Sequence, residues 1–137
     1  MRVLIDTNLV LTYVSGREDK YSEQTDQIMK LCAEEKVEGF VAFHTLSTVW
    51  YIARKLPNET RRDWIIQICE LLTLSGADNQ AVLKAVHNLD FKDFEDALQD
   101  CCAQTSLADY IVTANIRDFA HSDVPAVTPD QFLKILS

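Results

Sequence analysis

Carboxylate and amide side chains follow two apolar runs of the chain. Asp6 comes directly after the aliphatic run at residues 2–5, and Asn115 and Asp118 follow the run at residues 110–113. Short β-branched and aliphatic runs of this kind predict buried strands of a parallel sheet. Because the carboxyl ends of parallel strands meet at one edge, we expect these three side chains to lie near one another.

A third group of acids lies on a predicted helix over residues 93–104. At about 100° per residue, Asp93, Asp96 and Asp100 fall in one sector beside an apolar stripe. Glu95 points away from that sector and is expected on the solvated surface. Three like charges on one face repel each other unless a cation relieves them.

Each of these residues also has a purely structural interpretation. Asp6 can cap the helix that follows it, and Asp90 and Asp93 suit a helix N-terminus. Asp100 can be solvated, and the polar residues at 115 and 118 can be turn formers. Their joint occurrence at strand ends favours a functional site.

Oxygen donors in such a group are the ligands that Mg²⁺ or Mn²⁺ prefers. They could hold one ion, or two about 4 Å apart. Such ions activate water and neutralise the charge that develops at a phosphodiester. The pattern therefore predicts metal-dependent phosphodiester hydrolysis. His44 invites a general-base role, but a lone histidine at a helix start is more often a cap or surface residue, and metal-bound water needs no separate base. His87 and His121 have no patterned partner, so no histidine is assigned a role.

The elements that position these residues alternate between short strands and amphipathic helices. We predict strands at residues 2–5, 40–43, 110–113 and 124–127, and helices at 7–14, 21–36, 44–56, from 58 onward, at 80–87, at 93–104 and after Thr128-Pro129. This alternation predicts an α/β fold with a short, mainly parallel central sheet covered on both faces. We expect a single domain over residues 1–137.

The charge balance restricts the type of partner. Thirteen Lys and Arg against 21 Asp and Glu give a net charge of −8, which is unlike a protein that holds nucleic acid by broad phosphate neutralisation. Half of this charge, −4, falls at positions 90–100, where a cation would bind. Six cations either line one side of a cleft or are solvated helix ends: Arg17, Lys20, Arg54, Lys55, Arg61 and Arg62.

The cysteines and the apolar runs bear on location. Cys32, Cys69, Cys101 and Cys102 form no CxxC pair, and we expect them to be reduced thiols. No stretch approaches the roughly 20 apolar residues of a membrane span, and no export signal is visible. We expect a cytoplasmic protein without a membrane partner.

Three segments resemble one family of small nucleases. They are VLIDTNLVL at residues 3–11, DFEDALQ at 93–99 and ADYIVTANIRDF at 108–119, and the tail VPAVTPDQFLKIL follows them. With this order and spacing, the chain resembles the PIN-domain family, and within it the VapC-type toxins of bacterial toxin–antitoxin modules. The resemblance implies a three-layer α/β/α fold and a Mg²⁺- or Mn²⁺-dependent endoribonuclease that leaves a 5′-phosphate.

The resemblance assigns roles to matching positions of this sequence. It implies that Asp6 is the first metal ligand, that Asp96 is the acid of the late helix, and that Asp118, with Asn115, follows the fourth strand. The three aspartates would be the catalytic acids. Asn8 matches a polar position near the metal.

One position departs from the family pattern. Many PIN domains carry a Glu on the helix after the second strand, and Thr48 stands there in this chain. A hydroxyl binds Mg²⁺ less strongly than a carboxylate does. We hypothesise that Asp93, which recurs in the DFEDA form of the motif, substitutes for the missing acid as an additional metal ligand.

Three functions remain open from the sequence. The first is the ribonuclease toxin, whose resemblance also implies an RNA substrate, a cognate antitoxin and a homodimer. The second is a degenerate PIN-like binding or scaffold module, which the Thr48 position favours. The third is a receiver-like phosphoacceptor domain, which is disfavoured because only one acid ends the first strand and no Lys follows residues 110–113.

Overall fold

A five-stranded parallel sheet forms the centre of the computed structural model, which describes residues 1–137. The strand order is β3-β2-β1-β4-β5. The strands are β1 (Arg2–Ile5), β2 (Glu38–Ala42), β3 (Thr73–Ser75), β4 (Tyr110–Val112) and β5 (Ala126–Val127). Every neighbouring pair is parallel. The predicted α/β fold with a short parallel sheet is confirmed.

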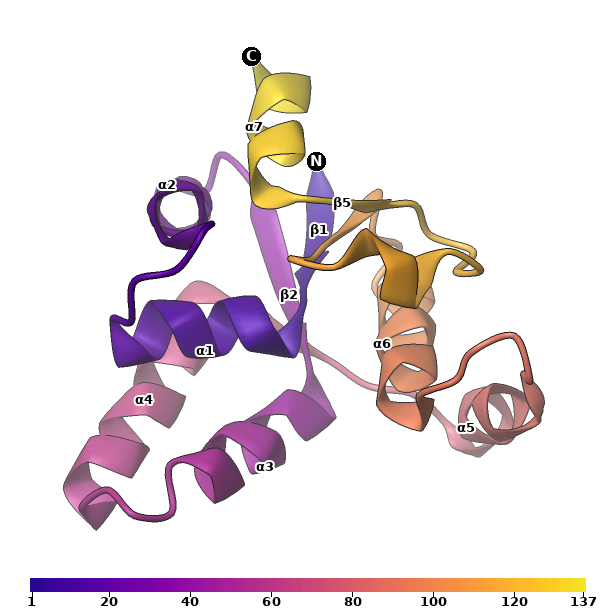
Figure 1. Cartoon of the computed structure of the whole chain (residues 1–137), viewed down its shortest axis with the longest axis horizontal. Helices are drawn as coiled ribbons and strands as arrows, with labels where there is room; N and C mark the ends of the chain where they lie inside the picture. The colour runs from indigo at the N-terminus through magenta and orange to yellow at the C-terminus, as the bar shows by residue number, and fades with distance from the viewer.

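Helices cover both faces of the sheet (Figure 1). One face carries α1 (Thr7–Ser15), α2 (Ser22–Ala33), α4 (Asn58–Leu71) and α7 (Pro129–Leu136). The other carries α6 (Phe94–Thr105), with α5 (Asn79–His87) packed against it. Because successive strand residues point to opposite faces, Val3 and Ile5 enter the larger core and Leu4 enters the smaller one.

Three connections place side chains at the carboxyl edge of the sheet. Asp6 separates β1 from α1, and α3 (Phe43–Ile52) begins directly after β2 and contacts α1 and α4. Beyond β4, the short 3₁₀ helix η1 (Ile116–Phe119) follows Asn115. The carboxyl ends of β1 and β4 and the helices that begin beside them therefore meet at this edge of the sheet.

Local signals explain most element ends. Thr128 and Gln131 form a capping box with Pro129 at the first helical position of α7, and Gly16 ends α1 with a φ of 67°. Strand β3 was not predicted, because it has only three residues and two of them are exposed. Helix α3 stops at Ile52, earlier than predicted, since the chain turns before Pro57.

The cysteines form no disulfide: all four are free, and Cys69 is exposed whereas the other three are buried. No helix combines the length and the apolar character that crossing a membrane requires.

We predict that Gly39→Ala destabilises the fold by about 1–3 kcal/mol. A Cβ at Gly39 would stand 2.5 Å from Leu72 Cδ2 and 2.7 Å from Cys32 Sγ, so two buried side chains must move. Urea unfolding of both proteins measures the change in the free energy of unfolding. Gly76→Ala is the control, because its Cβ meets nothing within 4 Å. Equal effects at the two glycines would contradict this close packing of α2 against β2.

Candidate active site

The carboxylate of Asp6 is buried at the end of β1, with 8% of the residue exposed. Asp6 occupies the N-cap position of α1, yet its side chain caps nothing. Its oxygens instead accept hydrogen bonds from Thr113 Oγ1 at 2.8 Å and from Gln99 Nε2 at 3.1 Å. The side chain of Asp6 is therefore held by β4 and α6, and the capping interpretation is wrong.

A buried hydrogen-bond network surrounds this carboxylate. Gln99 Nε2 also bonds to Thr7 Oγ1 at 2.7 Å, and the Thr7 and Thr45 hydroxyls lie 2.8 Å apart. Thr113 Oγ1 accepts the backbone N–H of Asn115 at 3.1 Å. The network joins α1, α3, α6 and the segment after β4 around one acid. Within it, the Oε1 atom of Gln99 is buried and has no hydrogen-bond partner.

Burial and neighbouring charges raise the pKa of two acids at this edge, Asp6 and Asp96. Burial raises the pKa of Asp6 to about 6, against the hydrogen bond from Thr113, with smaller contributions from the charges of Glu95 and Asp118. Burial also raises the pKa of Asp96 to about 7, with the charges of Asp93, Asp118, Asp6 and Glu95 adding to it. Both residues thus take up protons near neutral pH unless a positive charge is supplied.

A pocket of about 270 Å³ opens beside these acids. Its walls come from the start of α6 and from η1 with the loop after it: Asp90, Lys92, Asp93, Asp96, Arg117, Asp118, Ala120 and His121. The pocket thus combines acids that suit a cation with Lys92, Arg117 and His121, which suit an anion. Such a mixture fits a phosphate bound next to a metal ion.

The other residues assigned from the sequence lie around this pocket or beyond it. Asp93 caps α6 by accepting the N–H of Glu95 at 2.7 Å, and Asn115 caps η1 by accepting the N–H of Arg117 at 3.3 Å. Asn8 is exposed on the first turn of α1. Thr48 donates its hydroxyl to the His44 carbonyl at 3.3 Å. The Thr48 hydroxyl therefore donates its hydrogen bond to the backbone of its own helix, α3.

Asp100 and Glu95 have environments that the sequence left open or placed differently. For Asp100 the solvated alternative is wrong: it is buried, and its carboxylate accepts a bond from Gln104 at 3.0 Å and the N–H groups of Asp123 and Val124 at 3.5 Å each. It therefore anchors the loop before β5. Glu95 is half-buried rather than fully solvated, and its charge acts on both Asp6 and Asp96.

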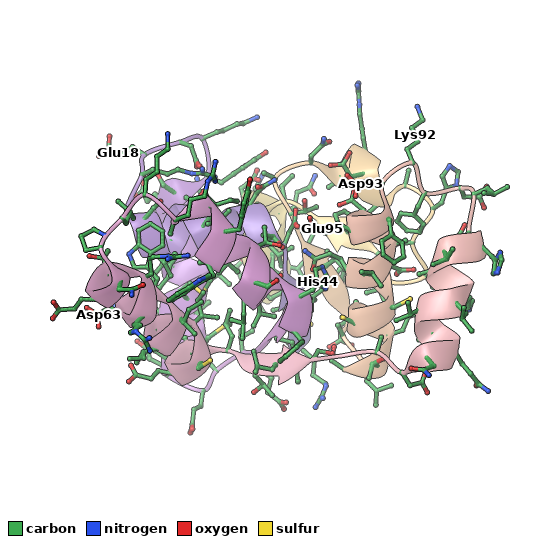
Figure 2. All side chains as sticks on the ribbon, turned by 90° about the horizontal axis from the view of Figure 1, so that it is seen from below. Glu18, His44, Asp63, Lys92, Asp93 and Glu95 are labelled. Atoms are coloured by element: carbon green, nitrogen blue, oxygen red, sulfur yellow. The ribbon has the colours of Figure 1, made fainter.

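Glu95 faces a histidine of α3. Figure 2 shows Glu95 and His44 next to each other between α3 and α6, and the Glu95 charge acts on the His44 imidazole. Burial lowers the pKa of His44 and so favours its neutral form, while Glu95 opposes this effect. His44 Nε2 is buried without a hydrogen-bond partner.

Sequence reasoning missed Glu95, Gln99, Thr7, Thr45 and Thr113. One signal was available for Gln99: it stands three residues after Asp96 and four after Glu95, on the same side of a helix. The threonines carried no such signal, because a hydroxyl in an apolar run is equally common in ordinary cores.

The donor set suits a hard divalent cation, since all of its candidate atoms are carboxylate or amide oxygens and their charges repel one another. However, no group of three or more His, Cys, Asp or Glu side chains is assembled closely enough to hold a metal ion. Neighbouring acids contribute to the raised pKa values of Asp6 and Asp96, but the acidic side chains do not surround a single point.

The comparisons with known proteins decide the family. The sequence matches the PIN domain over residues 2–117, which is most of the chain. The chain belongs to the PIN-domain family. This PIN domain has no match among curated protein sequences.

Solved structures share the fold at low sequence identity. VapBC2 from Rickettsia felis, solved with a DNA fragment from its promoter, has a TM-score of 0.72 at 15% identity, covering 93% of this chain and 98% of that chain. VapBC-1 from nontypeable Haemophilus influenzae has a TM-score of 0.67 at 18% identity, covering 95% and 99%. VapC20 of Mycobacterium tuberculosis, a toxin that cleaves the sarcin-ricin loop, has a TM-score of 0.65 at 16% identity, covering 93% and 99%.

We predict that Asp6→Asn raises the free energy of unfolding at pH 8 in EDTA by up to about 3 kcal/mol, and raises it much less at pH 4.5. The folded pKa of Asp6 is raised from 3.8 to about 6, so the folded protein binds more protons between these values and loses stability as the pH rises through them. The variant has no such charge to bury. Urea unfolding at the two pH values measures the difference.

The matched control is Asp26→Asn, because Asp26 is exposed on α2. This control should change stability little at either pH. A pH-independent effect of Asp6→Asn, or a loss of stability at pH 8, would show that the folded state does not disfavour the Asp6 charge.

Proposed function

We propose that this PIN domain is a Mg²⁺- or Mn²⁺-dependent endoribonuclease, the toxin of a type II toxin–antitoxin pair, folded as a single domain over residues 1–137. The buried Asp6 carboxylate carries this proposal, because Thr113 and Gln99 hold it where the charges of Glu95 and Asp118 also act. Gathered acids of this kind are destabilising in the free protein, which supports a role in binding a cation.

Each residue has a defined part in the proposed reaction. Asp6, Asp96 and Asp118 are the catalytic acids and, with Asn115 and Asp93, the proposed metal ligands. A bound ion would activate water and neutralise charge on the scissile phosphate. Thr113 and Gln99 fix the two oxygens of Asp6 in place.

The pocket walls hold the ion and orient the substrate. Asp96 lines the pocket together with Asp118, where its carboxylate would help to hold the ion beside the attacking water. Arg117 and Lys92 line the same pocket and orient the phosphate oxygens. Asn8 and Thr48, which do not line this pocket, have secondary roles.

The partners follow from the same proposal. The substrate is RNA, a cognate antitoxin covers the site, and two copies form a homodimer in the cytoplasm. Support comes from the relatives: two of the similar structures are VapBC assemblies, and VapC20 is a toxin that cleaves the sarcin-ricin loop.

A second candidate is a PIN-like binding or scaffold module with little nuclease activity. Two observations favour it: the Thr48 hydroxyl is bonded to its own helix where family members carry a Glu, and no preassembled metal group is present. The nuclease is supported better, because Asp6, Asp96 and Asp118 are all retained and the charges of Asp6 and Asp118 both act on Asp96.

We predict that the purified chain cleaves a mixed RNA pool only when Mg²⁺ or Mn²⁺ is added. Asp6→Asn and Asp96→Asn should each lower the rate at least about 100-fold, since losing a ligand costs more than losing one of its outer partners. Asp26→Asn changes an exposed acid of α2 that does not line the pocket, so this variant should cleave like the wild type. Gel analysis of 5′-labelled RNA gives the rates.

One further variant tests the compensation by Asp93. Asp93→Asn keeps an oxygen for the N–H of Glu95 but removes the charge, so a large loss of cleavage supports Asp93 as a ligand. Unchanged cleavage and metal affinity would reduce Asp93 to a helix cap. Equal residual cleavage by the wild type and the Asp6 and Asp96 variants would indicate contamination and favour the binding module.

A further inference from the structure

The turn between α3 and α4 carries an aromatic and basic surface that no acid neutralises. It consists of Trp50, Tyr51, Arg54, Lys55, Arg61 and Arg62, and we call it the Arg–aromatic surface. The protein has three ion pairs, Arg2–Glu38, Arg17–Asp19 and Lys36–Glu34, and none includes these cations. Four of the chain's 13 Lys and Arg thus gather unpaired in a protein of net charge −8.

Aromatic rings hold the guanidinium groups in place. The Arg61 guanidinium lies 3.8 Å from the centre of the Trp50 ring, and its Nη2 donates to the Trp50 carbonyl at 2.7 Å. The Arg54 guanidinium lies 4.2 Å from the Tyr51 ring and donates to the Tyr51 carbonyl at 3.1 Å. Stacked arginines keep their charge and lose less side-chain freedom when they bind an anion.

Structural bracing accounts for only part of this arrangement. Arg61 is half-buried and connects α4 to the end of α3, which is a role in the fold. Arg54, Lys55 and Arg62 are exposed and connect no elements through side-chain bonds. Of the two nearby acids, Glu59 and Asp63, neither pairs with them, and Figure 2 shows Asp63 extending outward from α4.

Helix α3 connects this surface to the candidate active site. Its first turn is bonded into the Asp6 network through Thr45, and its last turn carries Trp50 and Tyr51. No acid occurs in its ten residues. Phe43 and Tyr51, 65% and 64% exposed, stand eight residues apart on one side of the helix, with exposed Ser47 between them.

We propose that the exposed side of α3 and the Arg–aromatic surface form a binding track for single-stranded RNA that leads away from the active site. This inference rests on the proposed ribonuclease function. Exposed aromatic rings stack on bases, while guanidinium groups contact phosphates. Ten helical residues span about 15 Å, the length of about four stacked nucleotides.

The chemistry of the track favours RNA over a protein partner. Aromatic residues and arginine are enriched at protein interfaces as well, but here four cations have no ion-pair partner and the adjoining helix α3 carries no acid, which favours a polyanion. A polyanion with flat bases satisfies both groups at once. The rest of the protein is strongly acidic, so this surface is where a nucleic acid can approach without repulsion.

The test is RNA binding by full-length protein that carries Asp6→Asn, so that the strand stays intact. Fluorescence anisotropy with a labelled 12-nucleotide single-stranded RNA in EDTA gives Kd at several salt concentrations. Arg54→Gln with Arg62→Gln should raise Kd at least about tenfold and reduce the slope of log K against log salt by about 1.4, since each lost phosphate contact removes about 0.7. Arg61 is left in place because it braces the two helices.

A second variant separates stacking from charge. Tyr51→Ala should raise Kd about tenfold with an unchanged salt slope, because stacking releases no counterions. The matched control is Lys30→Gln with Lys84→Gln, two exposed cations on other faces, which should leave Kd within about twofold. Circular dichroism establishes that each variant is folded.

Three results would overturn the track. They are unchanged binding in the Arg54/Arg62 variant, an equal loss in the Lys30/Lys84 control, or a dimer that dissociates in the Arg54/Arg62 variant while RNA binding persists, which would make this surface a contact between copies. A failure of the nuclease proposal would look different. If RNA binding depends on Arg54 and Arg62 but the wild-type protein cleaves no RNA, the binding track is supported and the nuclease proposal is wrong.

Discussion

Placing a negative charge at the end of β1 is costly, because Asp6 is almost fully enclosed. Two donors, Thr113 and Gln99, offset part of this cost, yet burial still raises the pKa of Asp6 to about 6. The acids of α6 and η1 add like charges to the same region. The protein thus retains an electrostatic arrangement that is unfavourable by itself and becomes favourable when a cation is bound. We regard this constraint as the basis of the site.

The surrounding elements hold the side chain of Asp6 in one conformation. Thr113 follows β4, Gln99 is on α6, and the hydroxyl pair of Thr7 and Thr45 connects the network to α1 and α3. Parallel strands bring these elements to one edge of the sheet. Helix α3 begins at that edge. It therefore fixes the position of the surface at its far end relative to the catalytic acids.

The sequence predicted those features that depend on local pattern. Apolar runs and capping residues predict the strands β1 and β4, their parallel pairing and the capped helix α7. It did not predict features that depend on what packs against a side chain. A helical wheel groups Asp100 with Asp96, but only the loop before β5 explains why Asp100 anchors backbone N–H groups. The wheel likewise gave no reason for Gln99 to be buried beside Asp6.

Proton release on metal binding tests the central claim most directly. Mn²⁺ is titrated calorimetrically into the wild-type protein at pH 6.5 and pH 8.5, each in two buffers of different ionisation enthalpy. With pKa values of about 6 for Asp6 and about 7 for Asp96, binding should release about one proton at pH 6.5 and almost none at pH 8.5. Binding without pH-dependent proton release, or no binding at either pH, would contradict the account of a buried acid group held for a cation.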